Sequence, residues 1–127
     1  MMSPEQALFT KVKLIAMETD IDTYEYLPNN VDYPFIFIGE QFGDGIRDNK
    51  DTRFITVSQS VHIYHDNHRQ RGTISSIIYD LQKEIFKIKR VGGRKVEIVD
   101  DNLQILPDNT TNTPLLHGVL DITFRIY

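Results

Sequence analysis

Three histidines lie close together in the chain and are the residues best suited to metal chemistry. His62, His65 and His68 occur in the segment His-Ile-Tyr-His-Asp-Asn-His-Arg, where Asp66 could add an oxygen ligand. Imidazole nitrogens bind transition metals. Residues three apart share a face only on a helix, whereas His62 falls on an expected strand and His68 in the loop after it. We therefore expect no metal and no other cofactor, and keep the three histidines as candidate ligands for an alternative function, a small metal- or nucleic-acid-binding module.

Other catalytic motifs are missing from the sequence. There is no cysteine, which excludes thiolate zinc sites and cysteine nucleophiles. Ser75 and Ser76 do not stand in a Gly-x-Ser-x-Gly elbow, and no glycine-rich phosphate loop occurs. The segment Gly92-Gly93-Arg94-Lys95 follows an expected helix instead of opening one, so it lacks the helix dipole that helps to bind phosphate. We expect a protein that is not an enzyme.

Length and charge narrow the class of protein further. The 127 residues suit a single domain, residues 1–127. The formal net charge of −4 argues against a dedicated binder of duplex DNA, which needs a basic surface. The first residues lack the basic start and apolar core of a signal peptide, and no apolar run approaches the ~20 residues that span a bilayer. We expect a soluble intracellular protein with no membrane partner.

Two segments have the signals of amphipathic helices. Ser3 is a suitable N-cap, Pro4 stands at the first helical position, and Gln6 completes a capping box. The second helix is expected from about Thr73 to Lys89, with the helix signal ending at Gly92-Gly93. Its apolar residues recur at helical spacing: Ile74, Ile77, Ile78, Leu81, Ile85 and Ile88.

The other regular segments alternate as strands do. Expected strands are Thr23–Leu27, Phe35–Gly39, Phe54–Tyr64, Arg94–Val99, Leu103–Leu106 after a turn at 100–102, and Leu116–Tyr127. Strands joined by turns pair antiparallel, and the helices must bury their apolar stripes. We therefore expect an α+β fold, a mainly antiparallel sheet of about four to six strands with two helices packed on one face.

A long polar connection, residues 41–53, is expected between two of these strands. It contains glycines and acidic residues and is longer than a tight hairpin needs. Loops on a rigid scaffold often bind partners. We predict a subunit or partner interface here, with Phe42 and Ile46 as apolar anchors and Arg47 and Lys50 as charged rim contacts.

The last expected strand offers a second candidate surface. One face is apolar, and the other carries the polar and aromatic residues Asp121, Thr123, Arg125 and Tyr127. We predict that these four residues contact a subunit or partner. Tyrosine is enriched at protein interfaces because it buries area yet tolerates water. The alternation alone leaves open whether this strand is central or an edge.

The chain as a whole resembles the small tail-terminator, or tail-completion, proteins of long-tailed bacteriophages. The resemblance rests on the arrangement of elements and on four stretches: Tyr-x-Tyr-Leu-Pro (24–28), Tyr-Pro-Phe-Ile-x-Ile-Gly (33–39), His-Ile-Tyr (62–64) before an Ile/Leu-rich helix, and Gly-Val-Leu-Asp-Ile-Thr-Phe-Arg-Ile (118–126). The family pattern often has Trp in the strand before the second helix, where this chain has Tyr64.

The resemblance implies a structural role in virion assembly. Members cap the phage tail tube, stop its polymerisation and provide the docking surface for the head neck, commonly as a six-membered ring. The implied partners are other copies of the chain, the tail tube protein and a head-neck or connector protein, and genome DNA passes through without specific binding. The protein would assemble in the host cytoplasm and remain in the virion. The alternative within this class is another neck component, a head-closure or connector protein.

Overall fold

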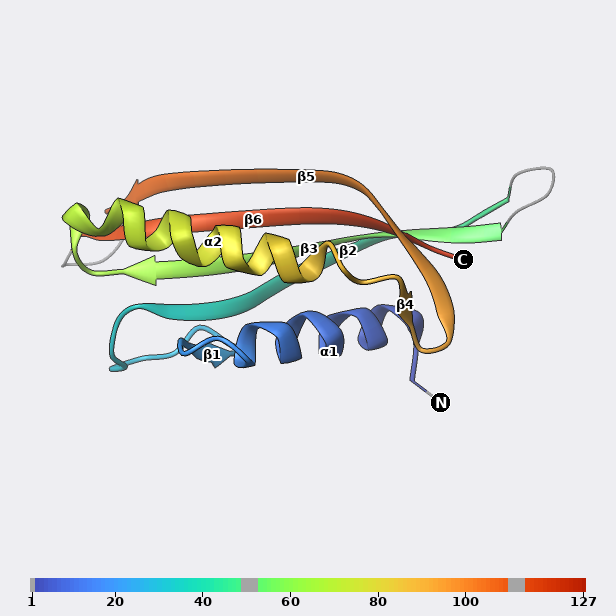
Figure 1. The fold of residues 1–127 in the computed structure, drawn as a ribbon, viewed down its shortest axis with the longest axis horizontal. Helices are drawn as coiled ribbons and strands as arrows, with labels where there is room; N and C mark the ends of the chain where they lie inside the picture. Colours follow the sequence, from blue (N-terminus) through green and yellow to red (C-terminus); the bar gives the residue numbers. More distant parts are fainter. Residues whose placement is uncertain (1, 49–52, 110–113) are drawn as a thin grey trace.

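A computed structural model shows a sheet with two helices on one face (Figure 1), and the described residues are 2–48, 53–109 and 114–127. In chain order the elements are α1 (Pro4–Met17), β1 (Asp22–Tyr24), β2 (Phe35–Asp48), β3 (Arg53–His65), the short 3-10 helix η1 (His68–Gln70), α2 (Arg71–Ile85), β4 (Arg90–Val91), β5 (Arg94–Asp108) and β6 (Leu115–Ile126). In the described ranges no helix is long and apolar enough to cross a membrane. The expected α+β class is confirmed.

The strands of the sheet are ordered β1-β2-β3-β6-β5-β4. β1 runs parallel to β2, and the other neighbouring pairs are antiparallel, so the expected antiparallel sheet is correct for all but one pair. β6 lies between β3 and β5, and its residue Leu120 faces Val61 on one side and Leu103 on the other. The last strand is therefore central, which settles the question that the sequence left open.

α1 begins where the sequence predicts. The Ser3 side chain accepts a hydrogen bond from the Gln6 backbone N–H at 3.1 Å, and Pro4 occupies the first turn. This cap satisfies one of the donors that every helix start leaves without a helical partner. The helix then buries one face against the sheet: Leu8, Val12, Ile15 and Ala16.

The core lies between the helices and the apolar face of the sheet. α2 contributes the predicted stripe, and β6 contributes alternate residues, of which Leu120 and Phe124 are fully buried. Gly118 of β6 lies directly under α2: a Cβ atom built there would come within 2.7 Å of Ile74 Cγ2 and 3.0 Å of Ile78 Cδ1. A glycine is needed here because the helix packs this closely on the strand.

Three expected boundaries are wrong. Residues 41–48, expected as a loop, continue β2 and pair with β3, so that Gly43 faces Val57. The expected turn at 100–102 lies inside one long strand, β5, whose register shifts between Ile98 and Asp100. α2 ends at Ile85, before the expected end at Lys89, and the two glycines after it form the β4–β5 turn with positive φ angles of 54° and 77°.

Candidate functional site

The face of the sheet opposite the helices carries the polar residues of β3 and β6. These residues pair across the two strands: the hydroxyls of Ser58 and Thr123 are 2.8 Å apart, and the Ser60 hydroxyl donates to the carboxylate of Asp121. Cross-strand pairs of this kind stabilise a sheet. Asp121 and Thr123, predicted as interface residues, are therefore half-buried and bonded within their own chain.

The other two predicted interface residues of β6 lie at the end of this face. The Arg125 guanidinium stands 4.9 Å from the centre of the Phe54 ring, and the Tyr127 ring lies 5.7 Å from that ring. The Lys95 ammonium lies 5.6 Å from the centre of the Tyr127 ring. The four predicted residues thus line one face in a row, and their role at an interface stays a prediction.

A pair of histidines lies at the other end of the same face. His62 Nδ1 and His117 Nε2 are 2.7 Å apart, and His62 Nε2 is 3.2 Å from a carboxylate oxygen of Glu40. The His117 ring stacks on Tyr64, with ring centres 4.2 Å apart and planes 10° apart. β2, β3 and β6 each contribute one member of the row Glu40–His62–His117.

The structure does not assemble the three histidines named from the sequence. His65 contacts Asp66 at 3.4 Å at the end of β3, and His68 is exposed in η1. His62 instead meets His117, which lies 55 residues further along the chain. Within the described part of the chain no group of three or more histidine, cysteine or acidic side chains is placed to hold a metal ion.

Burial and neighbouring charges shift the pKa of two members of this row, His117 and Glu40. Burial, and then the charge of His62, lowers the pKa of His117 below its usual value, while Asp108 and Glu40 act in the opposite direction. Burial opposes ionisation of Glu40, but hydrogen bonds and the charge of His62 outweigh it, so the pKa of Glu40 is lowered. Both shifts follow from the partial burial of these groups and from the charged and hydrogen-bonding groups beside them.

The contacts of the row Glu40–His62–His117 differ from those of a serine nucleophile and its base. In the described residues the Ser60 hydroxyl is bonded to the Asp121 carboxylate, whereas His62 is bonded to Glu40 and His117. Serine nucleophiles need a direct contact with the imidazole base. The spacing of residues along the chain did not point to His117, because its neighbours are determined by the pairing of β3 with β6. The alternation of both strands does place His62 and His117 on the polar face of the sheet.

β2 exposes the two apolar residues that the sequence singled out. Phe42 and Ile46 are 67% and 65% exposed. Phe42 faces Ser58, and Ile46 faces Ile55, across the ladder. Figure 1 shows the last part of β2 and the first part of β3 extending beyond both helices. Arg47 lies in β2 next to these residues, and Lys50 lies outside the described residues.

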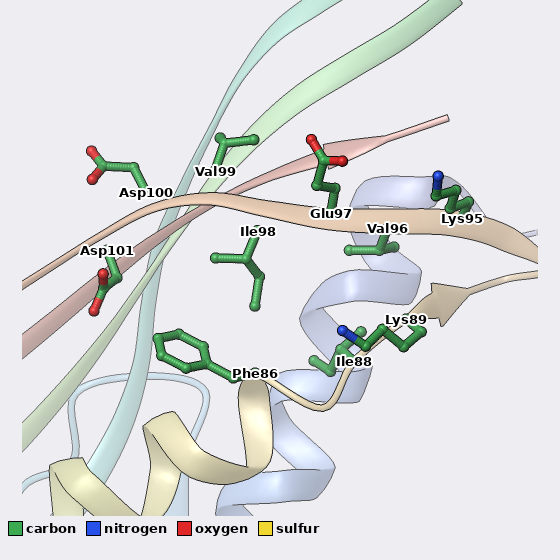
Figure 2. A pocket seen from close by; sticks show the side chains of 10 residues that line it. All are labelled: Phe86, Ile88, Lys89, Lys95, Val96, Glu97, Ile98, Val99, Asp100 and Asp101. Atoms are coloured by element: carbon green, nitrogen blue, oxygen red, sulfur yellow. The ribbon is translucent and has the colours of Figure 1, made fainter.

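A shallow groove separates the end of α2 from β5 (Figure 2). Its floor is apolar, with Phe86, Ile88, Val96 and Ile98, and charged residues of β5 stand on its rim. The Val96 N–H donates to the Lys89 carbonyl at 2.9 Å on one side, and Gln82 donates to Asp101 at 3.1 Å on the other. This groove lies apart from the histidine pair, which belongs to β3 and β6.

Comparisons with known proteins give structural neighbours only. No family model and no curated protein matches the sequence. A chain from the virion of a native gene transfer agent particle has a TM-score of 0.55 at 7% identity, over 98% of this chain and 94% of that chain. A second solved chain has a TM-score of 0.55 at 10% identity, over 96% and 92%. The fimbrial biogenesis protein PilO from Pseudomonas aeruginosa has a TM-score of 0.45, too low to support an argument. The first two likenesses show that the fold of the whole chain recurs in other proteins.

Proposed function

We propose that this chain is a structural virion protein that caps a phage tail tube, stops its polymerisation and presents a docking surface for the head neck. The observation that carries the proposal is the end-to-end likeness in fold to a chain from a gene transfer agent virion. The resemblance of the Tyr-Pro-Phe strand and of the last strand to tail-terminator proteins also supports a virion role. The role is structural, not catalytic.

The exposed apolar residues of β2 provide a physical means of assembly. Phe42 and Ile46 present exposed apolar side chains on this strand, whose last part extends past the helices in Figure 1. Exposed apolar patches mark sites of protein association. Burying each of two such side chains contributes roughly 1.5–3 kcal/mol. These two side chains of β2 suit contact with a neighbouring ring of a tube or with a neighbouring copy.

The proposal is tested by removing the protein from the particle that contains it. Tails assembled without the chain should be overlong or lack heads in electron microscopy. Supplying the wild-type chain or the control variant Tyr79→Ser, at a similarly exposed position on α2, should restore normal tails. The variant Phe42→Ser/Ile46→Ser should fail to do so. Tails of normal length joined to heads in the absence of the chain would refute the proposal.

A head-closure or connector role is the competing assignment within virion assembly. The two roles predict different binding partners for the purified chain. A terminator should decorate the ends of tail tubes in negative-stain images, whereas a connector should bind portal-bearing heads.

A further inference from the structure

The β1–β2 connection forms an exposed tyrosine-rich projection beyond the C-terminal end of α1. Tyr26 and Leu27 are 69% and 57% exposed. The Tyr26 ring meets Tyr24 at 6.2 Å between centres, and Tyr24 meets the buried ring of Phe35 at 5.8 Å. We call residues 24–27 the knob. The chain of rings fixes the knob to the sheet, so it is an anchored projection with two large apolar side chains turned outward.

The knob is surrounded by carboxylates. Asp22 and Asp32 are both exposed. Partial burial, followed by the charges of Asp22, Tyr26 and Asp32, raises the pKa of Tyr24, as expected when carboxylates lie near its hydroxyl. Glu25 is already paired, with Lys13 at 2.6 Å. The knob is therefore an apolar projection in an acidic setting.

A groove of matching character lies along α1, beside β4. We call it the α1 groove; its lining is Met2, Ala7, Thr10, Lys11, Leu14, Arg90, Val91 and Gly92. Met2 and Leu14 are exposed, so the groove presents apolar surface to solvent. Lys11 and Arg90 are exposed cations on its rim. Figure 1 shows β4 beside the N-terminal part of α1 and β1 beyond its other end.

We propose that the knob of one copy docks in the α1 groove of a second copy. Tyr26 and Leu27 would cover Met2 and Leu14, and the carboxylates Asp22 and Asp32 would face the cations Lys11 and Arg90. Buried tyrosines are frequent interface hot spots, and opposite charges at the rim set the register. Because the two surfaces differ, the contact is head-to-tail, and repeating it closes a ring or extends a filament.

This contact rests on the proposed assembly role. It is tested on the purified chain alone, so the contact and the assembly role can be refuted separately. Sedimentation velocity from micromolar to millimolar protein, at low and high ionic strength, should show reversible self-association that weakens with salt. The variants Tyr26→Ser/Leu27→Ser and Leu14→Gln/Arg90→Gln should each weaken association about tenfold or more. Tyr79→Ser on α2 is the exposed-site control and should behave as wild type.

Mixing the two variants gives the decisive result. Each retains one intact surface, so together they should form a one-to-one dimer and nothing larger. If either variant fails to fold by circular dichroism, the charge variants Asp32→Asn and Lys11→Gln replace the pair in the same mixing experiment. The proposal is overturned if the wild-type chain stays monomeric throughout, if both variants associate as wild type does, or if the mixture remains monomeric.

Discussion

Gly118→Ala tests the close packing of α2 on the central strand. The added Cβ would lie 2.7 Å from Ile74 Cγ2, closer than real Cβ atoms approach such groups, and 3.0 Å from Ile78 Cδ1, which is tighter than most Cβ contacts. Both isoleucines are buried on the sheet-facing side of α2. The helix must move away from the strand, or the isoleucines must leave their preferred rotamers, to admit one methyl group.

The size of the effect follows from two opposing contributions. Overpacking a well-filled core costs about 1–3 kcal/mol. Replacing glycine by alanine also restricts the unfolded chain, which stabilises the folded state by about 0.4–1 kcal/mol. The net loss in the free energy of unfolding should be about 1–2 kcal/mol. Gly43 of β2 is the matched control, because its nearest neighbour to a new Cβ is the Thr56 carbonyl oxygen at an ordinary 3.8 Å.

Urea denaturation followed by circular dichroism measures both variants. Gly118→Ala should lower the midpoint without changing the slope, whereas Gly43→Ala should be neutral or slightly stabilising. The loss should shrink in an Ile74→Leu background, which lacks the clashing Cγ2 methyl. A Gly118→Ala protein as stable as wild type would show that the helix does not pack on β6 as described.

Three further predictions concern stability. The pKa of His117 is lowered in the folded state, so the folded protein binds that proton less readily than the unfolded chain. The contribution of His117 to the free energy of unfolding should therefore be full above about pH 6.5 and decline as the pH falls below it. In denaturation curves across pH 5–8, His117→Gln should flatten that decline, and an unchanged decline would contradict the prediction. Gln59→Leu removes a buried amide that donates hydrogen bonds to the Gly39 and Glu40 carbonyls of β2. In the same urea assay it should lower the free energy of unfolding by about 1–3 kcal/mol. An unchanged free energy of unfolding would show that these hydrogen bonds do not stabilise the fold. Deleting Phe124–Tyr127 removes the buried side chains of Phe124 and Ile126 from a central strand. Each contributes roughly 2–5 kcal/mol to the free energy of unfolding, so the deletion should abolish the circular dichroism spectrum of the folded protein. A truncated chain that still folds would refute the central position of β6.

Local signals in the sequence predicted the elements that local chemistry determines. The Ser3 cap fixes the start of α1, and the side-chain alternation of the last strand matches its observed burial residue by residue. The apolar stripe of α2 is buried as predicted. Each of these features depends on neighbours three or four positions away, or on period-two alternation, so a single sequence carries the information.

The elements that were predicted wrongly from the sequence depend on the pairing of strands that are far apart in the chain. Residues 100–102 look like a turn because they are Asp-Asp-Asn, yet β6 pairs with them and holds β5 extended: Asp100 faces Thr123 and Asn102 faces Asp121. Gly43 and its polar neighbours are held in β2 by the opposite strand in the same way. Tertiary pairing overrides the weak β-propensity of such residues. The contact of His62 with His117 also depends on strand order, which spacing along the chain does not encode.

The central position of β6 changes how its polar face should respond to substitution. Thr123 and Asp121 are held by hydroxyl groups of β3, and Arg125 lies over a ring of β3, so these side chains connect strands within one copy. The side chains of Tyr26 and Phe42 are far more exposed, at 69% and 67%. Substitution of Thr123 should therefore lower stability before it lowers assembly, whereas substitution of Tyr26 should lower assembly at unchanged stability. If both outcomes are found, Thr123 stabilises the sheet within one copy and Tyr26 contacts another copy.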